Sequence, residues 1–158
     1  MASLAESYEP PITAADVARG IGRLFHRAAS VTLCEVPLGN GRRADVVALD
    51  ESGRLTIVEI KISAADLRGD AKWRDYLAYA DRFFWAVPPH LAALLDADRF
   101  DPGAAGVIVA DRYDAAVVRE AAWVKLNPAR RKAETLRFAR RAAGRLLWLG
   151  DPHCEEIG

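Results

Sequence analysis

The opening part of the chain carries apolar residues at helical spacing, from about residue 13 to residue 29. Thr13 stands three residues before Asp16, which is the arrangement of a capping box with Asp in place of the usual Glu or Gln. The pattern therefore predicts a helix that begins after Thr13 and buries one apolar stripe. The stripe comprises Val17, Ile21, Leu24, Phe25 and Ala28.

The pattern then changes to runs rich in β-branched and aliphatic residues. Three such runs, 31–38, 42–50 and 54–62, are divided by glycine-containing turns at 39–41 and 51–53. Runs separated in this way are typical of strands joined as hairpins. The sequence therefore predicts an antiparallel meander of three strands.

The rest of the chain alternates helical and extended patterns, and it ends in a long helix that Asn127 caps and Pro128 opens. The expected elements are a helix over 64–81, a strand over 83–87, a short helix to residue 95, a strand over 106–110, extended chain over 115–126 and a helix over 128–147. The order helix, three strands, helix, strand predicts an α/β fold, in which a mixed sheet has helices on both faces. Helix 64–81 is the first connection long enough for a parallel crossover.

Length and composition narrow the class of protein. The chain has 158 residues, which is enough for one domain, and we expect a flexible lead-in over 1–11, the domain over 12–150 and a tail over 151–158. Lys plus Arg and Asp plus Glu both number 22, so the net charge of zero excludes a polybasic nucleic-acid binder. The two cysteines form no metal-binding or disulfide pattern, and no apolar run is long enough to cross a membrane. We expect a cytoplasmic protein.

Three charged side chains converge in the hairpin of strands 42–50 and 54–62. Side chains alternate along a strand, so Glu59 and Lys61 share one face, where two charges are costly unless they are paired or used. Opposed residues of an antiparallel pair have numbers of constant sum, which a turn near residue 52 sets at about 104. That sum places Asp45 beside Glu59.

Two carboxylates and an ammonium group at one place suit metal-assisted hydrolysis of a phosphodiester. Asp45 and Glu59 would hold Mg²⁺ or Mn²⁺, with the backbone carbonyl of Ile60 as a further oxygen ligand. The metal would polarise the phosphodiester and lower the pKa of a bound water. Lys61 would orient or deprotonate that water and offset charge in the transition state. A plain salt bridge on a half-exposed sheet face is the structural alternative.

This arrangement, Asp45 followed by Glu59-Ile60-Lys61 on a hairpin between two helices, resembles the PD-(D/E)xK phosphodiesterase superfamily, with Ala44 in place of the proline. The run over residues 60–76, with 81–87 after it, is similar to the MmcB family of bacterial DNA repair proteins. The likeness covers about residues 12–150. The resemblance implies a restriction-endonuclease-like fold with an αβββαβ core, and DNA as the substrate class.

Further candidates for the site come from the first strand and the second helix. A turn centred at residue 40 gives a sum of about 80, which brings Glu35 near Asp45 as a candidate third metal ligand. Asp70, Trp73 and Tyr76 are expected to support the site, although core packing is the more common role of such aromatic residues.

Basic residues are concentrated in the last helix. Residues 127–145 include seven basic side chains and the single acid Glu134, a balance of +6 in a neutral chain. Such segregation suits contact with nucleic-acid phosphates. A solvated amphipathic helix with Ala133, Leu136 and Ala143 toward the core is the alternative. The predicted DNA contacts are Arg42, Arg43, Lys72, Arg130, Arg131, Arg137 and Arg141.

Together these features predict a DNA repair protein that acts as a metal-dependent endonuclease, a deoxyribonuclease that requires Mg²⁺ or Mn²⁺. A non-catalytic DNA-binding or scaffold module of a repair complex, with a vestigial site, is the alternative. A nuclease acting on RNA is a third hypothesis. The expected partners are DNA and another repair protein, with no membrane, and a homodimer stays open.

Overall fold

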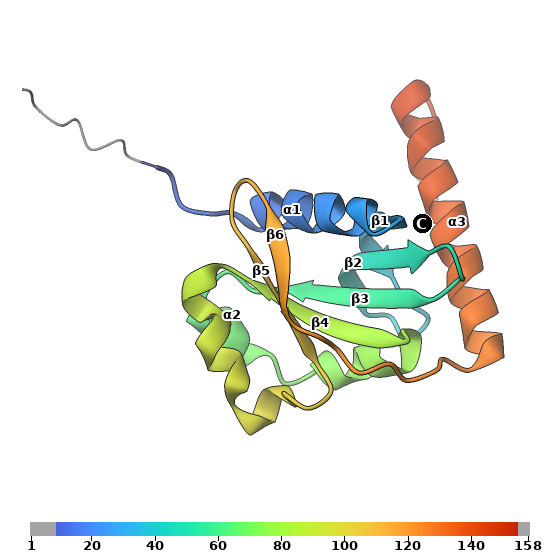
Figure 1. Cartoon of the computed structure of the whole chain (residues 1–158). Coiled ribbons are helices and arrows are strands. Elements are labelled where there is room, and N and C mark those ends of the chain that lie inside the picture. The colour runs from blue at the N-terminus through green and yellow to red at the C-terminus, as the bar shows by residue number, and fades with distance from the viewer. Residues whose placement is uncertain (1–8, 155–158) are drawn as a thin grey trace, which may run out of the picture.

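A mixed sheet forms the middle layer of the computed structural model, which describes residues 9–154 (Figure 1). The six strands follow one another in the sheet in the order of the chain. Most of the lead-in 1–11 and half of the tail 151–158 lie outside the described residues. The strands are β1 (Ser30–Pro37), β2 (Arg43–Asp50), β3 (Leu55–Ile60), β4 (Arg82–Val87), β5 (Gly106–Ala110) and β6 (Ala115–Arg119).

The predicted meander is confirmed, because β1, β2 and β3 are antiparallel neighbours. Val46 lies opposite Val58, which is the register that the turn near residue 52 predicts. Strands β3, β4 and β5 then run parallel, and β6 is antiparallel to β5. The sheet therefore has the mixed α/β architecture and the αβββαβ order that the sequence predicts.

Helices cover both faces of this sheet. Helix α1 (Ala14–Arg27) begins with the predicted capping box and packs its apolar stripe on one face, against residues such as Val58 and Phe84. The opposite face is covered by α2 (Ala64–Gly69) and by three 3₁₀ helices (Figure 1). These are η1 (Trp73–Tyr79), η2 (Pro89–Asp96) and η3 (Asp98–Phe100). A core of edge-to-face aromatic rings around Trp85 lies beneath them.

The single helix predicted over 64–81 is wrong. The chain leaves helix α2 at Asp70, whose backbone is extended and whose side chain accepts a hydrogen bond from the Lys72 amide. The next turns are 3₁₀, with three residues per turn, so Trp73, Tyr76 and Tyr79 line up on one side and are all buried. These aromatic residues recur at every third position, which matches the three residues per turn of a 3₁₀ helix rather than the 3.6 of an α-helix. This spacing is the reason for the change from α-helix to 3₁₀ helix.

Helix α3 (Pro128–Gly150) has the predicted cap, since Asn127 accepts hydrogen bonds from the amides of Ala129 and Arg130. The alternative orientation, in which Ala133, Leu136 and Ala143 face the core, is wrong. Ala133, Leu136 and Ala143 are exposed, whereas the buried residues are Glu134, Phe138 and Gly144. Ion pairs and hydrogen bonds of its polar side chains with the domain hold the helix in this orientation.

Candidate active site

Asp45 and Glu59 lie side by side where β2 begins and β3 ends, as the register predicts. The Asp45 amide donates to Glu59 Oε1 at 3.0 Å, and the Ile60 amide donates to Asp45 Oδ2 at 2.8 Å. Each carboxylate therefore takes a backbone donor of the strand pair, which fixes the position of both acids. This arrangement is more than a surface ion pair, because no cationic side chain bonds to either carboxylate among the hydrogen bonds and salt bridges of the described residues.

Burial makes a double negative charge at this place costly. Glu59 is only 4% exposed, and burial, followed by the charge of Asp45, raises its pKa to about 8. Burial also raises the pKa of Asp45, against the opposing effect of the Ile60 amide. A bound cation would favour the ionised form of both carboxylates, so this pair is a candidate place for one.

Lys61 follows β3 directly and points to Asp70 instead of Glu59. Its Nζ lies 2.9 Å from Asp70 Oδ2, and both side chains are largely buried. Burial lowers the pKa of Lys61, but the hydrogen bond and charge of Asp70 and the charges of both other acids outweigh it, so the pKa is raised. Lys61 is therefore a firmly held cation. A groove of about 480 Å³ lies against this pair and is lined by Lys61, Ala65, Asp66, Gly69, Asp70, Ala71 and Lys72.

The two aromatic candidates, Tyr76 and Trp73, are both buried residues of η1. The Tyr76 hydroxyl donates to the backbone carbonyl of Arg43 at 3.1 Å, two residues before Asp45. Burial, followed by the charges of Glu59 and Asp45, raises the Tyr76 pKa. Trp73 is buried in the core, with its ring 5.3 Å from the ring of Trp85. Both rings hold η1 against the sheet.

Glu35 lies across from Asp45 in the register that the turn near residue 40 predicts, but no hydrogen bond among the described residues joins its carboxylate to Asp45 or Glu59. It has a left-handed backbone (φ 52°), its side chain is 66% exposed, and its carboxylate lies 3.6 Å from the Arg43 guanidinium. Within residues 9–154 no three His, Cys, Asp or Glu side chains are grouped to hold a metal. The oxygen atoms that could bind a hard metal ion here belong to Asp45, Glu59 and the backbone carbonyl of Ile60. Such a partial set fits Mg²⁺ or Mn²⁺, which keep several waters and bind substrate phosphate.

Arg131, one of the predicted DNA contacts, instead forms an ion pair with the buried Asp81. Its guanidinium lies 2.5 and 2.9 Å from the two oxygens of Asp81. Asp81 also accepts the amides of Leu55 and Leu126 at 2.8 and 2.9 Å. We therefore assign Arg131 to stability. Sequence reasoning missed Asp81, and no local pattern connects it with a residue so far along the chain.

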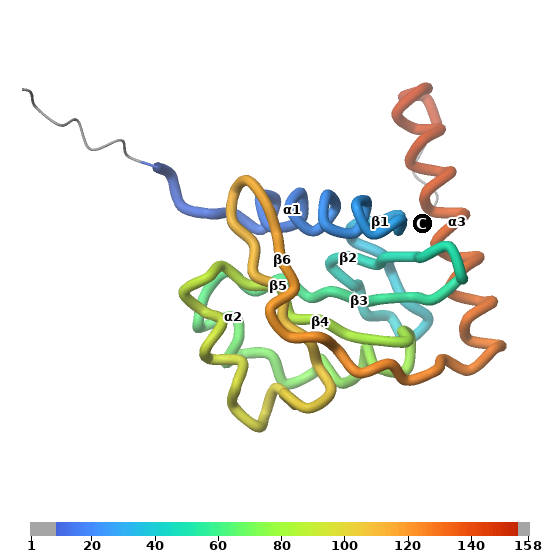
Figure 2. The backbone as a smooth tube through the Cα atoms, viewed as in Figure 1, coloured from blue at the N-terminus to red at the C-terminus, as the bar shows by residue number. Residues whose placement is uncertain are grey.

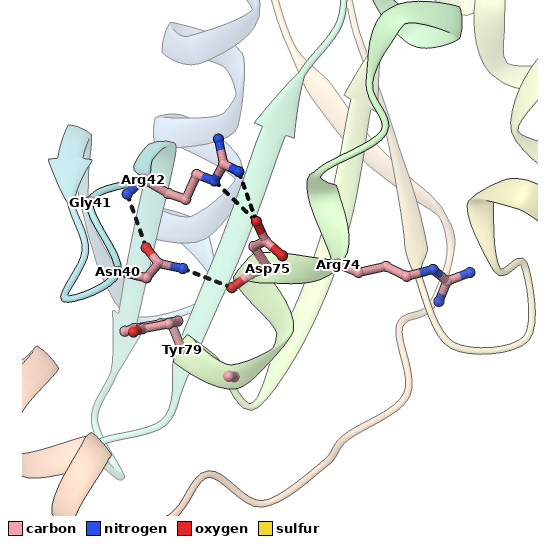
Figure 3. A pocket seen from close by; sticks show the side chains of 7 residues that line it. Asn40, Gly41, Arg42, Arg74, Asp75 and Tyr79 are labelled. Carbon is pink, nitrogen blue, oxygen red and sulfur yellow. Dashed lines mark hydrogen bonds and ion pairs between the residues drawn. The ribbon is translucent and has the colours of Figure 1, made fainter.

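Other predicted contacts also have partners within the protein. Arg42 bonds to Asp75 at 2.9 and 3.1 Å, and Figure 3 shows this pair at the wall of a pocket of about 530 Å³. Arg74 lines the same pocket and points the other way; the sequence did not single it out. Arg137 Nε lies 3.3 Å from Glu134, and Arg130 stacks over the Tyr79 ring at 4.1 Å.

The family follows from comparison of the whole chain. A family model described as "DNA repair protein MmcB-like" matches residues 4–153. The chain belongs to the MmcB-like DNA repair protein family. This membership confirms the resemblance and places the chain among DNA repair proteins. A comparison with curated proteins found no match.

Two solved structures are similar to this one. SPO1766, a protein of unknown function from Silicibacter pomeroyi, is 39% identical, with a TM-score of 0.82 over 96% of this chain and 98% of that chain. A repair endonuclease from Pyrococcus abyssi is 22% identical, with a TM-score of 0.37 over 58% of this chain and 45% of that one. In the described residues, no helix has the length and apolar character needed to cross a membrane.

Proposed function

We propose that this family member hydrolyses DNA phosphodiester bonds with Mg²⁺ or Mn²⁺ bound at Asp45 and Glu59. The observation that carries the proposal is the pair of buried carboxylates, each fixed by a backbone amide and neither bonded to a cationic side chain. In an ion pair with a structural role, a cationic side chain compensates the charge of the carboxylate, as Arg131 does for Asp81. DNA as the substrate class rests on family membership.

The residues of the site have distinct roles in this proposal. Asp45 and Glu59, with the Ile60 carbonyl, would hold the metal, which when bound polarises the phosphodiester and lowers the pKa of a water. Lys61 stabilises negative charge on the phosphate in the transition state, because its raised pKa keeps it protonated. Asp70 is a positioning residue that orients the ammonium group. Lys72, at the rim of the groove, contacts the phosphate backbone.

Cleavage of labelled duplex, flap and single-stranded DNA by the purified chain tests this function. Mn²⁺ or Mg²⁺ should support cleavage, and Lys61→Ala should reduce its rate by about 100-fold or more. Lys125→Ala, at an exposed lysine away from the carboxylates, is the matched control and should cleave like wild type. Undiminished cleavage by Lys61→Ala would remove the proposed mechanism.

A non-catalytic DNA-binding module is the second candidate, and the incomplete set of metal ligands favours it. Such a module should bind the same DNA in the presence of a chelator. Its affinity should fall with salt, with a smaller slope in Lys72→Ala. Calorimetry separates the two, because the nuclease proposal requires Mn²⁺ binding that Asp45→Asn/Glu59→Gln abolishes.

A further inference from the structure

A second cavity opens at the same end of the sheet as the groove beside Lys61. Strands β2 and β3 are antiparallel, so the start of β2 and the end of β3 lie together. Lys61 follows the end of β3, and Arg42, three residues before Asp45, precedes the start of β2. Arg42 lines the pocket of about 530 Å³ described above. Both cavities therefore lie at the end of the sheet that carries Asp45 and Glu59.

We call this second cavity the turn pocket. One wall is the turn between β1 and β2, and the other is η1 (Figure 3). Gly41 in the turn has a left-handed backbone (φ 81°), and no atom beyond its chain neighbours lies within 4 Å of the place where a side chain would start. A pocket of this volume is the size of a small-ligand site, which admits a segment of one polymer strand. Its polar side chains belong to Asn40, Arg42, Arg74, Asp75 and Tyr79.

The two arginines of the turn pocket differ in how their hydrogen-bond donors are used. Arg42 donates two hydrogen bonds to Asp75 Oδ2, at 2.9 and 3.1 Å, so its charge is compensated. Arg74 stacks over the Trp73 ring at 4.6 Å and lies 3.6 Å from the Asp101 carboxylate, which is too far for a hydrogen bond. Among the hydrogen bonds of residues 9–154, none is donated by the Arg74 guanidinium. Its donors are therefore available to an acceptor from outside.

The acids near the turn pocket oppose an anion only weakly. The side chain of Asp75 is 50% exposed and that of Asp101 is 39% exposed, so water and salt screen their charges. A phosphate offers two oxygens to the two arms of a guanidinium, in the geometry that arginine binds best. Arg74 therefore gains more from a phosphate than from the more distant carboxylate of Asp101.

We propose that the turn pocket binds the backbone of the DNA strand that passes Asp45 and Glu59, and that Arg74 holds one of its phosphates. The inference rests on the proposed function, which supplies DNA as the substrate. An extended chain advances about 3.3 Å per residue, so the three residues from Arg42 to Asp45 span about 10 Å. Phosphates of one strand follow one another at about 3.4 Å along the helix axis, so the turn pocket is about three nucleotides from the acids.

Binding of labelled oligo(dT) to the full chain in EDTA, followed by fluorescence anisotropy, tests the turn pocket without any cleavage. Arg74→Ala should weaken binding about tenfold, because it removes charge-assisted hydrogen bonds to a phosphate. It should also reduce the slope of log affinity against log salt concentration by about 0.7, the share of one phosphate of a single strand. Circular dichroism checks that the variant is folded.

Arg27→Ala is the matched control and should bind oligo(dT) like wild type. Arg27 is 52% exposed beside Asp114, much as Arg74 is 56% exposed beside Asp101. It belongs to α1, which lies on the opposite face of the sheet from η1 (Figure 2). A wild type that binds no DNA, or equal affinities of Arg74→Ala and Arg27→Ala, would overturn the proposal.

Replacing Asp75 separates a phosphate site from a turn with a purely structural role. In Asp75→Asn the amide oxygen can still accept a hydrogen bond from Arg42, but the negative charge is removed. The variant should bind oligo(dT) at least about threefold more tightly than wild type, because the carboxylate no longer repels the phosphate. If the pair only holds the turn in place, the variant should bind no better than wild type, and that result would contradict the proposal.

The failure of this inference and the failure of the proposed function are distinguishable. In the cleavage assay, Arg74→Ala should raise KM about tenfold and leave kcat nearly unchanged, because it removes binding that substrate and transition state share. If binding of oligo(dT) depends on Arg74 and no metal supports cleavage, hydrolysis is overturned and the turn pocket stands. If wild type cleaves DNA and Arg74→Ala binds like Arg27→Ala, the turn pocket is overturned and hydrolysis stands.

Discussion

Two buried acidic centres on the sheet differ in how their charge is compensated. Asp81 accepts two backbone amides and both arms of the Arg131 guanidinium, so its pKa is lowered despite its burial. Asp45 and Glu59 receive one backbone amide each, and their pKa values are raised. The charge of the first centre is compensated within the protein, whereas no cationic side chain bonds to the second among the described hydrogen bonds and salt bridges. Compensation, rather than burial alone, therefore separates a structural acid from a candidate functional one.

Replacing Asp81, the compensated acid, tests this comparison most directly. Asp81→Ala should lower the free energy of unfolding by about 3–5 kcal/mol, because it leaves the amides of Leu55 and Leu126 and the partly buried Arg131 without their partner. Denaturant unfolding measures this loss. Asp96→Ala removes a surface ion pair with Arg119 and should cost about 1 kcal/mol or less. Equal losses in the two variants would contradict the structural role of Asp81.

Neutralising Glu59, the uncompensated acid, should raise the stability of the protein, whereas the loss of Asp81 lowers it. The pKa of Glu59 rises from 4.5 in the unfolded chain to about 8, so the folded state binds the extra proton between these values. Without metal, wild-type stability should therefore fall as the pH rises through this range. Glu59→Gln should abolish this fall and be more stable than wild type by several kcal/mol near pH 9.

Thermal unfolding in metal-free buffers from about pH 5 to pH 9 measures that difference. The wild-type contribution of Asp81 has the reverse sign, since its pKa is lowered: it is present above the unfolded value of 3.8 and is lost in acid. If wild-type stability did not change between pH 5 and 9, the charge of Glu59 would have to be compensated by a group that does not contact it in this structure.

Metal binding should be coupled to loss of this proton. Because Glu59 holds a proton near neutral pH, Mn²⁺ must displace it, and the apparent affinity should rise about tenfold per pH unit below about pH 8. Calorimetry in two buffers of different ionisation enthalpy counts the proton. About one proton should leave with wild type. If no proton were released, Mn²⁺ would bind at a place other than Glu59.

The smallest effect is expected at Glu35. Its side chain is exposed and paired with Arg43, so Glu35→Gln should change Mn²⁺ affinity less than about twofold. Asp45→Asn should abolish binding in the same titration. A large loss in Glu35→Gln would restore Glu35 as a ligand, after a movement of β1.

The fold and the pair of acids were predictable because both depend on short-range rules. Alternation along a strand and the constant sum across a hairpin are enough to place Asp45 beside Glu59. The Lys61–Asp70 pair was foreseen only as proximity, since a change from α to 3₁₀ helix at Asp70 sets its geometry. The orientation of α3 was not predictable, because Arg131 and Asp81 are 50 residues apart.

The order of strands in the sheet is also the order in which the ribosome makes them. Each strand can join its predecessor as it emerges, and contacts of short sequence separation form at low entropic cost. Residues 45–70 contain the whole acidic cluster and Lys61, so this part can assemble before α3 has been synthesised. We expect the bond between Arg131 and Asp81 to form after the strands have paired, because Arg131 is synthesised later. Its loss should speed unfolding more than it slows folding.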